Sequence, residues 1–104
     1  MRPETIALFT RRHRIGLFDE TFLHKLDFGY GFIVNSNRYG AETVPYGYGR
    51  YASDSTFGHS GAAGAQAFAD PHSGLAYGYT RRRMAFPGGA APENQRLVKA
   101  VHTA

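Results

Sequence analysis

Apolar residues change their spacing twice along the chain, and these changes divide it into three zones. Residues 1–27 carry apolar positions at helix-like intervals, residues 28–86 contain strand-like and loop-like runs punctuated by glycine, and residues 92–103 return to a helical period. The pattern predicts a helical lead-in, a central sheet and a C-terminal helix. These elements define an α+β fold in which an antiparallel β-sheet is flanked by helices.

The two ends of the chain carry helix-start signals. Pro3 and Pro92 suit a first helical turn, where the fixed φ of proline fits and no amide hydrogen is needed, and Glu93 complements the helix dipole. The lead-in is expected to contain a second short helix as well. Asp19 is its expected N-cap, and its apolar side consists of Phe22, Leu23 and Leu26.

The middle zone contains the clearest strand signals. Two strand-like runs, residues 65–69 and 75–79, are separated by residues 70–74 (DPHSG), a strong turn sequence. This arrangement predicts an antiparallel hairpin, and the central members of the sheet are expected over residues 57–69 and 74–84. Residues 35–56 contain Gly, Pro, Asn, Ser and Asp throughout, which predicts a long irregular excursion of a kind that is often functional.

The length and composition of the chain exclude several classes of protein and site. A chain of 104 residues allows a single domain, and the absence of cysteine excludes a disulfide scaffold, a thiolate metal site and a thiol nucleophile. The five histidines lack metal-binding spacing, so neither a metal nor a cofactor is expected. No apolar run is long enough to span a membrane and the start does not look like a secretory signal, so a cytoplasmic location is the default expectation.

Residues 56–64 (TFGHSGAAG) are the segment that stands out chemically. Gly58 to Ala62 is one residue away from a Gly-x-Ser-x-Gly nucleophile elbow, which requires a strand, a sharp turn and then a helix. Here small residues and glycines follow Ser60 and lead into another strand-like run. The context therefore disfavours an elbow, and a plain polar turn at a strand start is the simple alternative.

The same segment resembles a different motif. His59-Ser60-Gly61 is similar to the third signature of the serine β-lactamase, penicillin-binding protein and related esterase superfamily, which is normally Lys-Thr/Ser-Gly. Residues 28–32 (FGYGF), residues 67–71 (AFADP) with Gly74-Leu75, Arg83-Met84 and the terminal helix resemble further family segments in the same order. The resemblance covers nearly the whole chain but only about the C-terminal third of a family member, which implies a partial transpeptidase-like fold in a single partial domain, residues 1–104.

The resemblance implies specific roles for four residues. In the family this strand borders the catalytic cleft, and the N–H after the triplet, here that of Ala62, completes the oxyanion hole. Gly61 would let the acyl group approach the strand, Ser60 would hydrogen-bond the substrate, and His59 would orient groups or carry protons. Since histidine is mostly neutral at pH 7, it attracts a β-lactam carboxylate less than lysine does, and this favours an esterase-like member over a true β-lactamase.

The nucleophile of the family is missing. No serine has a lysine three residues later, and no Tyr-x-Asn or Ser-x-Asn supplies the second signature. We therefore expect a truncated, split or partial hydrolase that is inactive alone. Its expected partners are the missing N-terminal part of the hydrolase or a second copy of itself, with a small acyl or ester substrate in the complete enzyme. Self-association is expected because the isolated sheet would expose an edge and an apolar face bearing Phe68, Leu75 and Tyr77 or Tyr79.

A non-enzymatic binding module is the alternative interpretation. The net charge of +4 comes from ten Arg and two Lys against eight acidic residues. The residues that suggest a surface for nucleic acid or an acidic partner are Arg81–Arg83 with Arg11, Arg12 and Arg14, and the tyrosines Tyr46, Tyr48 and Tyr51. Adjacent residues on a strand face opposite ways, so Arg81–Arg83 cannot share one surface. A solvated strand end and aromatic side chains packed onto the sheet are the favoured interpretations, and nucleic acid is not the expected partner.

Overall fold

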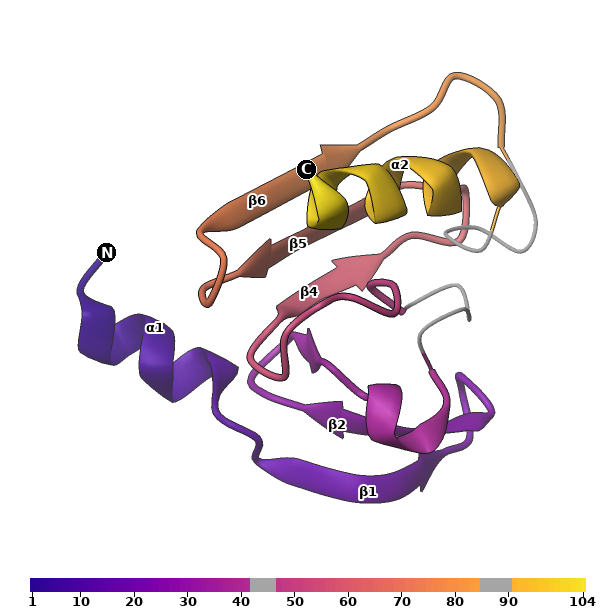
Figure 1. Cartoon of the computed structure of the whole chain (residues 1–104). Helices are drawn as coiled ribbons and strands as arrows, with labels where there is room; N and C mark the ends of the chain where they lie inside the picture. Colours follow the sequence, from indigo (N-terminus) through magenta and orange to yellow (C-terminus); the bar gives the residue numbers. More distant parts are fainter. Residues whose placement is uncertain (42–46, 85–90) are drawn as a thin grey trace.

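The computed structural model describes residues 1–41, 47–84 and 91–104 (Figure 1). Its strands form one six-stranded antiparallel sheet in which every strand pairs with its neighbours in sequence. The fold is therefore α+β, as the sequence predicts. The elements are α1 (Pro3–Thr10), β1 (Arg14–Asp19), β2 (His24–Phe28), β3 (Ile33–Val34), the 3-10 helix η1 (Asn37–Tyr39), β4 (Phe57–Ser60), β5 (Gln66–Asp70), β6 (Leu75–Tyr79) and α2 (Pro92–Thr103).

The prediction of a second helix in the lead-in is wrong, because β1 and β2 form a hairpin there. The Asp19 carboxylate accepts hydrogen bonds from the N–H groups of Thr21 and Phe22, both at 2.9 Å. An N-cap makes the same kind of contact, but here it closes a turn. Leu23 follows with a φ of 57°, in the left-handed region that a right-handed helix excludes. Only Pro3–Thr10 of the helical lead-in is helical.

The predicted hairpin of residues 65–79 is confirmed as β5 and β6, joined at Asp70↔Leu75. The carboxylate of Asp70 stabilises the turn by accepting the N–H of His72 at 3.1 Å. Two details differ from expectation. Residues 57–69 are two strands, since a turn closed by Gly64 N–H to Gly61 O interrupts them. Strand β6 stops at Tyr79 rather than residue 84, because its partner β5 begins opposite at Gln66 and offers no further pairing.

Helix α2 lies along one face of β5 and β6 (Figure 1). The core beneath it contains Phe68 and Val98, each 4% exposed, and the Phe68 ring stacks on the rings of Tyr77 and His102 at centroid distances of 4.9 and 5.3 Å. The expectation that Phe68 would be exposed is therefore wrong, because the chain supplies its own helix to cover that side chain. The apolar residues that remain exposed lie elsewhere, on β1 and α1 above all.

The excursion between β3 and β4 folds back on the sheet. Its described residues contain only the short helix η1, in agreement with the irregular segment expected over residues 35–56. Tyr48 is 1% exposed and donates its hydroxyl hydrogen to Ile33 O at 2.7 Å. The aromatic side chain thus belongs to the core, where it also lies 5.2 Å from the Phe68 ring. Residues 85–86, the end of the expected sheet zone, lie outside the described residues.

Candidate functional site

His59 and Ser60 end β4, and Gly61 follows them. At this point the strand has, among the described residues, a hydrogen-bonded neighbour on one side only. Strand β3 pairs only with Phe57 and Gly58, so beyond Gly58 the described part of the chain pairs with β4 through β5 alone. The Gly61 N–H is bound on the same side, since it donates at 2.8 Å to the carbonyl oxygen of Ala65, the residue before β5. The following residue, Ala62, is exposed, and no described residue accepts a hydrogen bond from its N–H.

His59 is exposed, and its imidazole contacts the backbone of the next residue. Its Nδ1 lies 2.8 Å from the Ser60 carbonyl oxygen. A carbonyl oxygen only accepts, so Nδ1 carries a hydrogen in this contact, and Nε2 is an acceptor whenever the ring is neutral. The ring packs edge-on against Phe22 at a centroid distance of 5.9 Å. Phe22 comes from the turn between β1 and β2, where the sequence had predicted a helix.

Ser60 lies at one end of a chain of side-chain hydrogen bonds. Gln66 Nε2 donates to Ser60 Oγ at 3.1 Å and to Gly47 O at 2.7 Å. Asn94 Nδ2 donates to Gln66 Oε1 at 2.8 Å, and the Tyr77 hydroxyl donates to Asn94 Oδ1 at 2.6 Å. Gln66 and Asn94 were not among the residues predicted for this site. The available signal was a polar residue in an apolar strand, two positions before Phe68 and hence on the same, inward face.

The two glycines that flank His59-Ser60 are required for different reasons. A Cβ on Gly58 would lie 2.6 Å from Phe68 Cα and would also overlap the Ala67 carbonyl oxygen, so the close approach of β4 and β5 requires glycine. A Cβ on Gly61 would meet nothing nearer than Ala65 Cβ at 3.7 Å. Local packing therefore explains Gly58 but leaves Gly61 unexplained.

The four predicted site residues share one end of the sheet. His59, Ser60 and Gly61 line a surface hollow of about 380 Å³, together with residues of β5 and β6 that include Gln66 and Tyr79. The structure thus brings the triplet together at an accessible place. Ala62 follows in the turn immediately after it.

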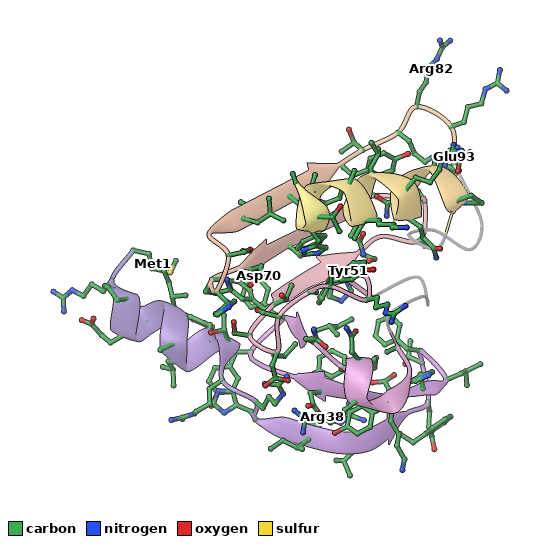
Figure 2. All side chains as sticks on the ribbon, in the orientation of Figure 1. Met1, Arg38, Tyr51, Asp70, Arg82 and Glu93 are labelled. Carbon is green, nitrogen blue, oxygen red and sulfur yellow. The ribbon has the colours of Figure 1, made fainter. Side chains whose placement is uncertain are left out.

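The arginine and tyrosine residues of the alternative interpretation do not gather in this way. Tyr48 is buried, Tyr51 is exposed, and Tyr46 lies outside the described residues. Arg81 donates from Nε to Arg83 O at 2.6 Å, and the side chain of Arg82 projects away from the ribbon (Figure 2). Arg12 and Arg14 are held in ion pairs with carboxylates. Within residues 1–41, 47–84 and 91–104, none of these arginines contacts one of these tyrosines, and Tyr51 instead lies beside Arg50, whose guanidinium carbon is 5.8 Å from the ring centroid.

The same described ranges contain no cluster of three or more His, Asp or Glu side chains placed to hold a metal ion. None of their helices has both the length and the apolar character needed to cross a bilayer.

The chain is similar in structure to part of a known esterase. No family model matches the chain, and no curated protein does. Among solved structures, the chain is similar to EstA from Arthrobacter nitroguajacolicus Rue61a, an esterase by name, with a TM-score of 0.74 and 30% sequence identity. The match covers 99% of this chain and 24% of that chain. The chain therefore spans about a quarter of the neighbour, which is consistent with a piece of a larger hydrolase.

Proposed function

We propose that this chain is the C-terminal segment of a β-lactamase-related serine hydrolase that cleaves esters through an acyl-enzyme. In this proposal β4 forms one wall of the acyl-binding cleft, and the Ala62 N–H is one of the two oxyanion-hole donors. The observation that carries the proposal is the match to EstA, in which almost every residue of the chain aligns with about a quarter of an esterase.

The local backbone geometry supports a donor role for Ala62. The Gly61 carbonyl oxygen accepts from the Gly64 N–H inside the turn, and in a planar trans peptide the N–H of the next residue points the opposite way. The Ala62 amide is therefore directed out of the turn and away from β5, toward the side on which β3 has already ended. An exposed amide that no described residue accepts from is free to meet the oxygen that becomes negative during acyl transfer.

The side chains beside Ala62 fit the proposed cleft. The missing Cβ of Gly61 leaves space for an acyl group, and its neighbours do not require that space for packing. His59 Nε2 is available as a proton acceptor at the same edge. The nucleophilic serine and its lysine would come from the rest of the hydrolase, so the chain is proposed to act with that part as its partner and to be inactive alone.

A graft tests this proposal. Replacing the matched quarter of EstA with this chain should give a protein that hydrolyses a p-nitrophenyl ester. In that graft Ala62→Pro removes only the proposed donor, because Ala62 occupies the second position of the Gly61–Gly64 turn, where proline is well tolerated. We expect kcat to fall about 10²–10³-fold, as for loss of one oxyanion donor.

Ala62→Gly is the matched control, since it changes the side chain but keeps the N–H, and it should retain kcat within about threefold. A folded graft in which Ala62→Pro and Ala62→Gly hydrolyse the ester equally fast would contradict the oxyanion role. A folded graft without any activity would contradict the hydrolase assignment of the segment.

A further inference from the structure

We propose that Gln66 is a positioning residue that fixes the Ser60 hydroxyl as a hydrogen-bond donor toward the surface hollow. This end of the site would then select a hydrogen-bond acceptor, namely an oxygen of the acyl substrate such as its ester carbonyl. The inference rests on the proposed function for the identity of the ligand. The orientation of Ser60 follows from hydrogen-bond chemistry alone.

The orientation of the Gln66 amide is fixed by Gly47. The Gly47 carbonyl oxygen only accepts, so the Gln66 atom 2.7 Å from it must be the NH₂ nitrogen. Rotating the amide by half a turn would place two oxygens against each other. Gln66 Oε1 then faces Asn94 Nδ2 at 2.8 Å, and Asn94 Oδ1 faces the Tyr77 hydroxyl. Every hydrogen bond of this side-chain network is consistent with this orientation of the Gln66 amide.

The orientation of Gln66 determines what Ser60 does with its hydrogen. The two hydrogens of Gln66 Nε2 go to Gly47 O and to Ser60 Oγ, so the Ser60 oxygen acts as an acceptor in that contact. Its own hydroxyl hydrogen must point elsewhere, and no described residue accepts it. Because Ser60 lines the hollow, that hydrogen is available to a bound ligand.

Burial makes this arrangement hard to reverse. Gln66 is 3% exposed and Asn94 is fully buried. Polar groups without water must keep their protein partners, so turning one amide would leave several groups unsatisfied. Gln66 thus occupies one of the two acceptor positions of Ser60 Oγ and leaves the hydroxyl hydrogen for an oxygen of a bound ligand.

Nuclear magnetic resonance on the full 104-residue chain tests the orientation. Both side-chain amide hydrogens of Gln66 should exchange with water more slowly than those of free glutamine. In Ser60→Ala, one of the two should exchange about fivefold faster, while the hydrogen bound to Gly47 O keeps its rate. Ser73→Ala, which removes a hydroxyl from the β5–β6 turn, is the control and should change neither. If Ser60→Ala leaves both rates unchanged, the inference is overturned.

Titration with ethyl butyrate tests the ligand. The amide signals of Ser60, Gly61 and Ala62 should shift, and the affinity should fall about fivefold in Ser60→Ala. Gln66→Glu should weaken binding as much, although it keeps the Ser60 hydroxyl, because the carboxylate draws the hydroxyl hydrogen inward. Ser60→Thr keeps the hydroxyl donor and should bind ethyl butyrate as tightly as the unsubstituted chain does. Wild-type affinity in a folded Gln66→Glu chain would overturn the inference; if that variant does not fold, the exchange rates in Ser60→Ala decide.

The two measurements distinguish failure of the Gln66 positioning role from failure of the proposed function. One outcome is that ethyl butyrate shifts the signals as expected but Ser60→Ala leaves the Gln66 exchange rates unchanged. This outcome would overturn the positioning role alone. Protected Gln66 hydrogens with no ester response at residues 60–62 would overturn the proposed function and, with it, the assignment of an acyl ligand.

Discussion

Arg12 and Asp27 form an ion pair that ties the start of the sheet to the excursion beside it. Arg12 Nε lies 2.7 Å from Asp27 Oδ2, and the Asp27 side chain is completely buried. The Asp27 carboxylate also accepts from the Gly16 N–H at 2.8 Å and from the Tyr39 hydroxyl at 2.9 Å. Arg12 in turn donates to Asn35 O at 2.8 Å. One buried carboxylate thus connects β1, β2 and η1.

Removing Arg12 should therefore destabilise the fold. In Arg12→Ala the buried carboxylate loses its nearest cation, and we expect the free energy of unfolding to fall by about 3 kcal/mol, as for broken buried pairs. Arg38→Ala is the control, because Arg38 is half-exposed and lies 3.7 Å from the same carboxylate. Its cost should stay below about 1 kcal/mol. Urea unfolding measures both, and equal losses would contradict a special role for Arg12.

Acid should unfold the chain through its buried carboxylates. Burial raises the pKa of Asp27, but hydrogen bonds from the Gly16 N–H, Arg12 and Tyr39 outweigh it and hold the pKa below the ordinary 3.8. The pKa of Asp70 is lowered too, since hydrogen bonds from Ser53, Ser73 and His72 outweigh the effect of burial. A lowered folded-state pKa contributes stability that is complete above about pH 5 and is lost as the pH falls through that pKa.

Urea unfolding at a series of pH values checks this dependence. Stability should fall progressively below about pH 4, and the fall should be shallower in Asp27→Asn, which removes one titrating group. A stability that stays flat from about pH 5 to pH 2 would show that these carboxylates titrate alike in the folded and unfolded chain.

Local signals explain which parts of the fold were predictable. The prediction of the β5–β6 hairpin was correct because residues 70–74 form a turn through their own side chains and backbone. The β1–β2 hairpin was missed because Asp19 makes the same contacts in a turn as in a helix cap. What decides between these structures is the burial of Asp27 against Arg12, fifteen residues away, and no local pattern contains that contact.

The sequence identifies the motif of the candidate site but not its surroundings. His59, Ser60 and Gly61 were found through their resemblance to a family signature, and they share one hollow. Gln66 and Asn94 were not found, because their role depends on a contact between β5 and α2 that spans 28 residues. A polar residue at an inward strand position indicates a buried network, but the sequence does not name its partner.

Gly58 and Gly61 should respond differently to substitution by alanine. Gly58→Ala forces a Cβ into the backbone of β5, and we expect a loss of about 3 kcal/mol or failure to fold. Gly61→Ala has room and should change stability by no more than about 0.5 kcal/mol. Thermal melts of the two variants measure the contrast. Equal destabilisation would show that Gly61 is structural and would remove its proposed role at the acyl group.

The isolated chain should not hydrolyse esters or β-lactams. It holds the proposed oxyanion donor without a serine and lysine pair to attack the substrate, and donors alone give only residual rates. An assay with a p-nitrophenyl ester checks this, with Ser60→Ala as the control for background hydrolysis. Turnover that disappears in a folded Ser60→Ala chain would make Ser60 a nucleophile and would replace our assignment.

The edge strand β1 should drive self-association of the isolated chain. Its outer side has no strand partner among the described residues, and it exposes Ile15, Leu17 and Phe18 at 57%, 56% and 55%. An apolar, unpaired edge provides a template for pairing with another chain. We expect light scattering to report species larger than a monomer, and the melting temperature to rise with protein concentration, since association stabilises the folded state by mass action.

Substitution distinguishes this edge from other apolar surface. Leu17→Lys puts a charge on the edge and should shift the chain toward monomer, because a lysine is costly to bury in a strand pair. Leu97→Lys replaces an apolar residue of similar exposure, 48%, on α2 and should leave association unchanged. If the unsubstituted chain is a monodisperse monomer with a sharp, concentration-independent melt above about 65 °C, the upper end for ordinary domains, then the chain is a complete domain. The proposal that it is part of a larger hydrolase would then be wrong.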